Sequence, residues 1–197
     1  SPRCNSGTLA NAVLGYYTRT GQACGVHPVT RLDRDTFGVV LFAKNAYVHE
    51  KFFHMQKQHL LSKTYLAAVY GGPRSEAGVI DLPIARVGER SLLRTVAPGG
   101  KESRTYFRVL SRFENYSILE LKPVTGRTHQ LRVHCFYAGF PILGDPQYQT
   151  GEARQFSREN GLFTQELCAK RLEFLHPLTG EPVVIESRQE VWGKKSM

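Results

Sequence analysis

Apolar residues recur at helical intervals in three parts of the chain. Ser6 or Thr8 can cap the first of these segments, and Asn45 can cap the second. Gly139 lies just beyond the third segment, where a glycine commonly ends a helix. The pattern therefore predicts three helices, over residues 8–17, 45–60 and 128–137.

Short runs rich in β-branched and aromatic residues predict strands in the remaining sequence. The pair Glu114-Asn115 is typical of a turn between two antiparallel strands. Residues 22–37 and 147–161 are predicted to be loops, the latter mobile, and residues 71–100 a loop or short hairpins. The predicted strands cover residues 39–43, 63–70, 104–113, 116–122, 167–174 and 183–186, with a turn at 176–180 before the last.

Most of the predicted strands follow other strands, with few helices between them. This order indicates an α+β fold, with a mixed, largely antiparallel sheet flanked by helices and loops. It argues against a doubly wound α/β fold. The sequence contains neither the dinucleotide-binding motif G-x-G-x-x-G nor the P-loop motif G-x-x-x-x-G-K-[ST]. A length of 197 residues fits a single domain over residues 1–197.

The charge of the chain bears on the kind of partner that it binds. There are 26 Lys and Arg residues against 17 Asp and Glu, which gives a net charge of +9. Such an excess favours a polyanionic partner such as nucleic acid, although charge alone is equally consistent with a merely basic protein. Within 71–100, Arg86 and Arg90 are candidate RNA contacts, and a solvated loop without a ligand is the alternative.

The four cysteines are isolated from one another in the sequence. Their spacing lacks the short intervals of a zinc site, and their density is too low for a disulfide framework. Free thiols in a reducing cytoplasm are therefore expected, and no apolar stretch approaches the roughly 20 residues of a membrane span. The cysteines are Cys4, Cys24, Cys135 and Cys168.

The segment 30–38 concentrates the candidate chemistry. Asp33 lies between Arg31 and Arg34, and a glycine and an apolar run follow. A carboxylate among fixed cations stays charged and oriented, which suits a nucleophile or a general base. The alternatives are a loop aspartate that caps a turn, or a nuclease site in which Asp33 and Asp35 bind Mg²⁺.

A second polar cluster, residues 126–134, could supply partner charges. Arg127 and Arg132 lie about 140° apart on an ideal helix, so both are not expected to point into one pocket. His129 and His134 are five residues apart, a spacing that does not suit a metal site on one helical face. No metal is therefore predicted.

Together these segments resemble the RluA-type pseudouridine synthases, the enzymes that isomerise uridine in RNA. The resemblance extends from about residue 7 to residue 187. Thr30 and Phe37 depart from the family, which usually has His and Ser at these two places. The blocks that carry the resemblance are residues 7–12, 31–36, 42–45, 63–67, 126–134, 141–146 and 176–182.

The resemblance implies roles for single residues. Asp33 matches the catalytic aspartate, Arg132 the arginine that pairs with it, and Tyr65 the tyrosine that stacks on the target base. A surface arginine and a core tyrosine are the alternatives for the last two. Either attack by the aspartate on the nucleoside or removal of a sugar proton fits the sequence. Further expected residues are Arg31 and Leu143 as support for the active site, and Arg34, Arg127, His129, Arg86 and Arg90 as RNA contacts.

The leading hypothesis is a cofactor-independent isomerase, monomeric, that acts on a stem-loop uridine of ribosomal or transfer RNA. A catalytically silent RNA-binding module of the same fold is the main alternative. The family's usual opening strand, and the small RNA-binding domain that many members carry before it, are not found. A trimmed or partial chain is therefore expected.

Overall fold

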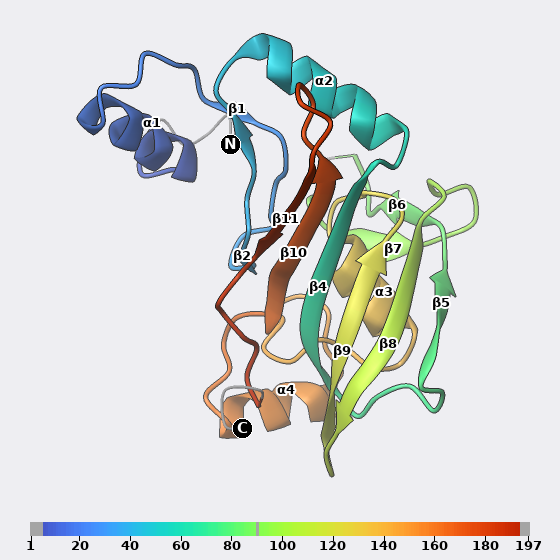
Figure 1. The fold of residues 1–197 in the computed structure, drawn as a ribbon. Helices are drawn as coiled ribbons and strands as arrows, with labels where there is room; N and C mark the ends of the chain where they lie inside the picture. Colours follow the sequence, from blue (N-terminus) through green and yellow to red (C-terminus); the bar gives the residue numbers. More distant parts are fainter. Residues whose placement is uncertain (1–5, 90, 194–197) are drawn as a thin grey trace. The chain divides into compact units, whose positions relative to one another are not determined.

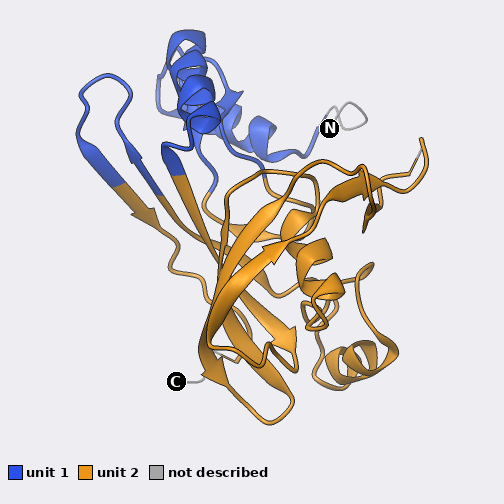
Figure 2. Ribbon diagram, turned by 90° about the vertical axis from the view of Figure 1, so that its right-hand side faces the viewer, with its two compact units in different colours: residues 1–31, 40–61, 173–183 blue, residues 32–39, 62–172, 184–197 orange. Residues whose placement is uncertain are grey.

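The computed structural model describes residues 6–89 and 91–193 and divides into two compact units (Figure 2). Helices and a mixed sheet are both present, so the predicted α+β class is confirmed. Unit 1 comprises Ser1–Arg31, Val40–Leu61 and Glu173–Val183, and unit 2 comprises Leu32–Val39, Ser62–Leu172 and Val184–Met197.

A seven-stranded sheet is the framework of unit 2 (Figure 1). Its order is β11-β10-β4-β9-β8-β5; β4, β9, β8 and β5 pair in antiparallel fashion, and β2 pairs with β10 in parallel. The five strands predicted after residue 60 are all present. The bounds are β2 Phe37–Gly38, β4 Leu61–Tyr70, β5 Ala77–Asp81, β8 Arg104–Arg112, β9 Tyr116–Pro123, β10 Leu167–Leu175 and β11 Pro182–Glu186.

The strand β4 buries side chains on both faces of this sheet. Ala67 belongs to one apolar cluster, together with Leu131 of α3 (Gln130–Tyr137). Leu66 and Ala68 belong to a second cluster, because successive residues of a strand point to opposite faces. The helix α3 therefore lies against one face of the sheet, behind β8 and β9 in Figure 1.

Residues 147–161 are not the loop that the sequence predicted. The helix α4 spans Gly151–Glu159, and Thr150 caps it by accepting a hydrogen bond from the Ala153 amide at 3.2 Å. Its fully buried residues are Ala153 and Ser157, and most of its other residues are exposed. Its inward face is Ala153, Phe156 and Ser157, and two apolar side chains in a strongly polar segment were too few to be read as a helix, so the prediction was wrong.

The apolar run 39–43 is a strand only at its end. β3 covers Phe42–Ala43 and pairs with β1 (His27–Pro28), whereas residues 39–41 lie outside any strand. Gly38 has φ +112°, and a Cβ at this position would lie 2.3 Å from the carbonyl oxygen of Ala169. Gly38 belongs to β2, paired with Ala169 of β10, and residues 39–41 separate this pairing from that of β3 with β1, so the predicted five-residue strand is not continuous.

The segment 71–100 contains more sheet than the sequence predicted. β5 pairs with β8 at the edge of the large sheet, so the prediction of a loop was wrong there. β6 (Ile84–Arg86) and β7 (Arg94–Val96) form a separate short hairpin, as expected. β5 was missed because its apolar run is only two residues, Val79 and Ile80.

Unit 1 contains α1 (Leu9–Arg19) and α2 (Ala46–Lys57). Thr8 and Asn45 cap these helices, each accepting a hydrogen bond from the amide three residues later, so both predicted caps are confirmed. Phe52 is the buried residue of α2. In the part of the chain that the structure describes, no helix is long and apolar enough to cross a membrane.

Candidate active site

The carboxylate of Asp33 and the guanidinium of Arg132 lie close together in unit 2. Asp33 is in the loop that precedes β2, and Arg132 is on α3. Oδ2 of Asp33 and Nη1 of Arg132 are 3.8 Å apart, and the side chains are 19% and 4% exposed respectively. The carboxylate is thus reachable from solvent, while its cationic neighbour is buried.

Arg132 is held more tightly by Asp145 than by Asp33. Its Nε donates to Oδ2 of Asp145 at 2.6 Å, and its Nη2 donates to Oδ1 at 2.8 Å and to Gln147 Oε1 at 2.9 Å. Burial lowers the pKa of Arg132, but the hydrogen bonds and charge of Asp145 and the charge of Asp33 raise it by more. The guanidinium therefore stays charged, with Nη1 left for Asp33.

Asp145 is itself fixed by the backbone. Its Oδ1 accepts hydrogen bonds from the amides of Gln147 at 2.8 Å and Tyr148 at 3.0 Å, and its side chain is fully buried. Sequence reasoning did not single out this residue. The available signal was an acidic residue next to the apolar pair Ile142-Leu143, because a buried carboxylate in such surroundings requires a partner.

Tyr148 is a further residue that sequence reasoning missed. The Cζ of Arg132 lies 5.0 Å from the centroid of its ring, within the range of a cation–π contact. The hydroxyl accepts a hydrogen bond from the Arg94 amide at 2.9 Å and lies 2.9 Å from Nδ1 of His129. Tyr148 thus links α3 to the β6–β7 hairpin.

His129 begins α3 in an unusual backbone conformation. Its φ is +57°, in the left-handed region, and this shifts the start of the helix from the predicted residue 128 to Gln130. Burial and the charges of Arg132 and Arg94 lower the pKa of its imidazole, and the charges of Asp33 and Asp145 only partly oppose this. His129 is therefore neutral near pH 7, next to the Asp33–Arg132 pair.

Tyr65 lies on β4, opposite Leu121 of β9, and is partly buried. Burial, with a contribution from the charge of Asp33, raises the pKa of its phenol to about 12. The hydroxyl therefore keeps its proton at physiological pH. The apolar part of Tyr65 packs against the cluster that includes Leu121 and Leu131.

Comparison with known proteins identifies the family to which these residues belong. Residues 5–136 match the sequence profile of RNA pseudouridylate synthase.

The chain belongs to the RNA pseudouridylate synthase family.

The predicted resemblance to RluA-type pseudouridine synthases is confirmed. The relative named uncharacterized RNA pseudouridine synthase YjbO, of Bacillus subtilis, is 39% identical over 176 residues, which are 89% of this chain and 60% of that protein. Ribosomal large subunit pseudouridine synthase C of Yersinia pestis is 38% identical over 92% of this chain and 58% of its own length. The chain thus spans about 60% of the length of these curated relatives.

Solved structures of the family share the fold. Human RNA Pseudouridylate Synthase Domain Containing 1 is 29% identical, with a TM-score of 0.72 over 84% of this chain and 69% of that chain. Human RNA Pseudouridylate Synthase Domain Containing 4 is 24% identical, with a TM-score of 0.75 over 93% of this chain and 80% of that chain. At this sequence identity the likeness supports the fold alone. The predicted pseudouridine synthase fold is therefore confirmed.

The arginines expected to contact RNA are exposed where the structure describes them. The Arg34 side chain is 94% exposed and lies 3.7 Å from Asp35. Arg127 is exposed and donates to the carbonyl of Glu102, and Arg86 donates to the carbonyl of Glu89. Arg31 is exposed in unit 1, and Arg90 lies outside the described residues.

Leu143 is a core residue and not the wall of an open pocket. It has no exposed surface and packs in the apolar cluster of Leu66 and Ala68. The expectation that it lines the site is not what the structure shows. A leucine that follows Ile142 in a buried turn fills space between β4 and its neighbours.

His134 takes a structural position in the core. His134 is fully buried, with Nδ1 2.9 Å from Thr105 Oγ1 and Nε2 3.0 Å from the Leu82 carbonyl oxygen. In the described part of the chain, no three His, Cys, Asp or Glu residues are grouped as a metal site. Cys24, Cys135 and Cys168 are free thiols, and Cys4 lies outside the described residues.

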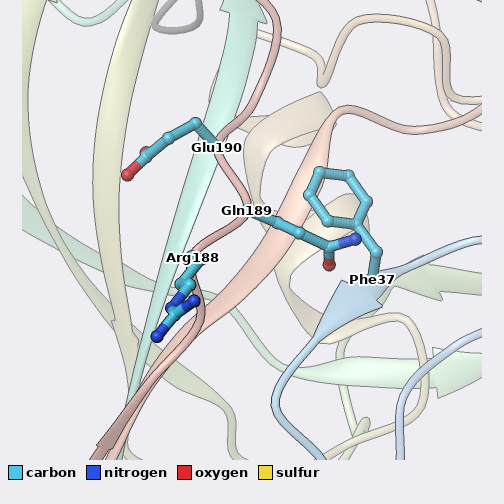
Figure 3. A pocket seen from close by; sticks show the side chains of 4 residues that line it. All are labelled: Phe37, Arg188, Gln189 and Glu190. Atoms are coloured by element: carbon cyan, nitrogen blue, oxygen red, sulfur yellow. The ribbon is translucent and has the colours of Figure 1, made fainter.

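The two family departures have local structural roles. The Oγ1 of Thr30 accepts a hydrogen bond from the Leu41 amide at 2.9 Å, inside unit 1. Phe37 packs against the apolar cluster of unit 2 and borders a hollow of about 410 Å³ with Arg188, Gln189 and Glu190 (Figure 3). In Figure 3 the Gln189 side chain extends toward Phe37, whereas Arg188 and Glu190 extend away from it. Asp33 is not in the lining of this hollow.

Proposed function

We propose that the protein isomerises a specific uridine of RNA to pseudouridine, with Asp33 as the catalytic carboxylate. The observation that carries the proposal is the partly exposed Asp33 carboxylate facing the buried Arg132 guanidinium. Family membership supports the reaction class. The Arg132 guanidinium can orient the carboxylate, because its Nη1 faces Oδ2 of Asp33 at 3.8 Å.

The reaction requires that a nucleotide leave its stack, because the glycosidic bond of a stacked base is out of reach of a side chain. The bond between N1 of uracil and C1′ of ribose breaks, the base rotates, and a bond between C5 and C1′ forms. C5 then loses its proton to solvent or to a base in the site, and N1 takes up a proton, so the product is an isomer of the substrate. Asp33 fits either of two first steps, attack at C1′ or removal of the C2′ proton to give a glycal.

Tyr65 and His129 fit supporting roles in this reaction. The Tyr65 ring can stack on the flipped uracil, a contact worth roughly 1–3 kcal/mol. Its phenol, protonated at physiological pH, can donate but is a poor general base. His129 carries no charge near pH 7, so it does not compete with Arg132 for Asp33.

We infer that the substrate is ribosomal RNA of the large subunit, with transfer RNA as the alternative. Two of the relatives are named ribosomal large subunit pseudouridine synthases C and D, and the net charge of +9 suits a polyanion. The exposed residues Arg34, Arg86 and Arg127 are proposed phosphate contacts. We also propose that the protein acts as a monomer in the cytoplasm, without a metal or cofactor.

The direct test is tritium release. RNA transcribed with uridine labelled by tritium at C5 loses the label on isomerisation, so wild-type protein must release it and Asp33→Asn must not. Asp35→Asn, two residues away, is the matched control and should keep activity. EDTA should leave release unchanged, whereas a Mg²⁺ nuclease would cleave the RNA and lose that cleavage. No release from ribosomal or transfer RNA would refute the proposal.

A further inference from the structure

A second hollow lies beside α4, in unit 2. It has a volume of about 330 Å³, at the lower end of the roughly 300–1,000 Å³ range of ligand sites. Two arginines, one exposed aromatic ring and a turn of buried backbone surround it. The lining residues are Gly144, Asp145, Pro146, Gln149, Arg154, Ser157, Arg158, Leu162 and Phe163.

The two arginines are neighbours on one face of α4. Arg154 and Arg158 are four residues apart, exposed, and both line the hollow. Among the described residues, neither guanidinium has an ion pair or a side-chain hydrogen bond in the structure. Like charges at this spacing destabilise a helix by a few tenths of a kcal/mol, so their pairing is unfavourable until an anion binds between them.

The aromatic side of the hollow is Phe163, whose exposed fraction is 72%. Its position follows from two tight turns. Gly161 adopts φ +70° directly after α4, and a Cβ on Gly144 would lie 2.1 Å from the Thr164 carbonyl oxygen. The backbone next to Phe163 is therefore packed closely against the Gly144 turn, and the ring faces solvent.

The floor of the hollow is hydrogen-bonded and rigid. Ser157 Oγ accepts from the Gly144 amide at 3.0 Å and from Gln149 Nε2 at 2.9 Å, and it donates to the Ala153 carbonyl. Asp145 also lines the hollow, while its carboxylate binds Arg132. One turn thus forms the floor of this hollow and holds the guanidinium next to Asp33.

We propose that this hollow binds a nucleotide of the RNA substrate, with the phosphate on Arg154 and Arg158 and the base against Phe163. Two cations next to an exposed ring match both halves of a nucleotide, because phosphates bind guanidinium groups and every base can stack on an aromatic side chain. A phosphorylated peptide would use the cations but not the ring. The inference rests on the proposed function for its choice of RNA, and it adds a substrate contact outside the catalytic cluster.

Binding of fluorescein-labelled 12-nucleotide oligouridylate, followed by anisotropy at several salt concentrations, tests the site. Arg154→Gln/Arg158→Gln should raise Kd about tenfold and reduce the slope of log K against log salt by about 1. Phe163→Ala should raise Kd at least about fivefold. Arg19→Gln/Arg74→Gln removes the same charge from exposed positions elsewhere and should change Kd less than twofold. Thermal melting of each variant verifies its fold.

Polyphosphate of matched charge separates base stacking from charge alone. Phe163→Ala should leave polyphosphate binding unchanged, whereas the double arginine variant should weaken it. The proposal is overturned if the two double variants behave alike, if Phe163→Ala leaves oligouridylate binding unchanged, or if a phosphoserine peptide competes as well as oligouridylate.

The proposed function fails by a different observation. If the protein binds oligouridylate through this hollow but releases no tritium, the proposed nucleotide site stands and the proposed isomerase function is refuted. If the protein releases tritium but its affinity for oligouridylate does not change when Arg154, Arg158 or Phe163 is replaced, the proposed function stands and the proposed nucleotide site is refuted.

Discussion

Arg132 binds Asp145 more closely than it binds Asp33. Its Nε and Nη2 donate to Asp145 at 2.6 and 2.8 Å, whereas its Nη1 lies 3.8 Å from Asp33. The bidentate pair fixes the plane of the guanidinium, because two parallel bonds leave it no rotation. Asp33 faces the remaining nitrogen, so one cation lies between two carboxylates. The negative charge of Asp33 is therefore oriented but not fully neutralised, which suits a group that must attack or remove a proton.

Replacing Arg132 by Lys tests whether the guanidinium must bind Asp145 and face Asp33 at the same time. A lysine keeps the charge but has no planar fork, so it cannot bind Asp145 by two bonds and also face Asp33. We expect kcat for tritium release to fall about 100-fold, with a smaller change in KM. Arg108→Lys, in a pair 3.3 Å from Glu120 whose arginine side chain is 62% exposed, is the control and should stay within twofold of wild type. Equal effects of both variants would contradict an orienting role for the fork.

Removing the carboxylate of Asp145 should destabilise the fold. Asp145→Ala leaves the Arg132 charge buried and without its closest partner, and breaking a buried pair costs about 3–5 kcal/mol. Glu76→Ala breaks an exposed pair with Arg112 and should cost less than about 1 kcal/mol. Urea unfolding of the two variants measures the difference. A cost for Asp145→Ala as small as that for Glu76→Ala would show that the pair does not hold Arg132.

The sequence predicted Asp33, Arg132 and Tyr65, which lie in motifs of the family, and missed the residues that hold Arg132 in place. Asp33, Arg132 and Tyr65 were predicted through a family resemblance, and the strand β4 that carries Tyr65 was predicted from its run of apolar and aromatic residues. Asp145 and Tyr148 were not predicted. Their contacts join a turn to a helix far along the chain, and no local spacing reveals such a contact.

The missed elements have the same physical origin. α4 is strongly polar and has only Ala153 and Phe156 as apolar side chains on its inward face, so the segment was predicted to be a loop. Residues 39–43 form an apolar run, but the chain on one side of residues 39–41 pairs with β10 and on the other side with β1. Tertiary contact decides both cases, and a single sequence does not contain it in readable form.

The phenol of Tyr65 should make stability depend on pH above 10. Its pKa is about 12 in the folded protein and about 10 in an unfolded chain, so the unfolded state loses its proton first. The stabilisation is fully present below pH 10 and is lost as pH rises from 10 to 12, by roughly 2–3 kcal/mol. Urea unfolding across this range should show the wild type losing its advantage over Tyr65→Phe. Tyr47→Phe, at an exposed position, should lose stability in parallel with wild type.

The imidazoles of His129 and His134 should titrate below the ordinary value of about 6.5. Burial is the main cause of the lowered pKa in both, since it disfavours the charged form. The contribution to stability is therefore present above pH 6.5 and is lost as pH falls through the folded pKa values. NMR titration of the ring protons measures this, with His129→Gln and His134→Gln used to assign the signals. A midpoint at or above 6.5 for either ring would contradict its burial.

Gly38 should be irreplaceable, because it positions the loop that carries Asp33. Alanine at this place would adopt φ +112° with its Cβ 2.3 Å from the Ala169 oxygen, so the loop must move. We expect Gly38→Ala to cost about 1–3 kcal/mol and to lower tritium release more than tenfold. Gly151→Ala, at the start of α4 with open space around its Cβ and an ordinary φ, should leave both quantities within error of wild type or raise stability slightly. Normal activity of Gly38→Ala would mean that the path of the chain between Asp33 and β2 does not govern the carboxylate's position.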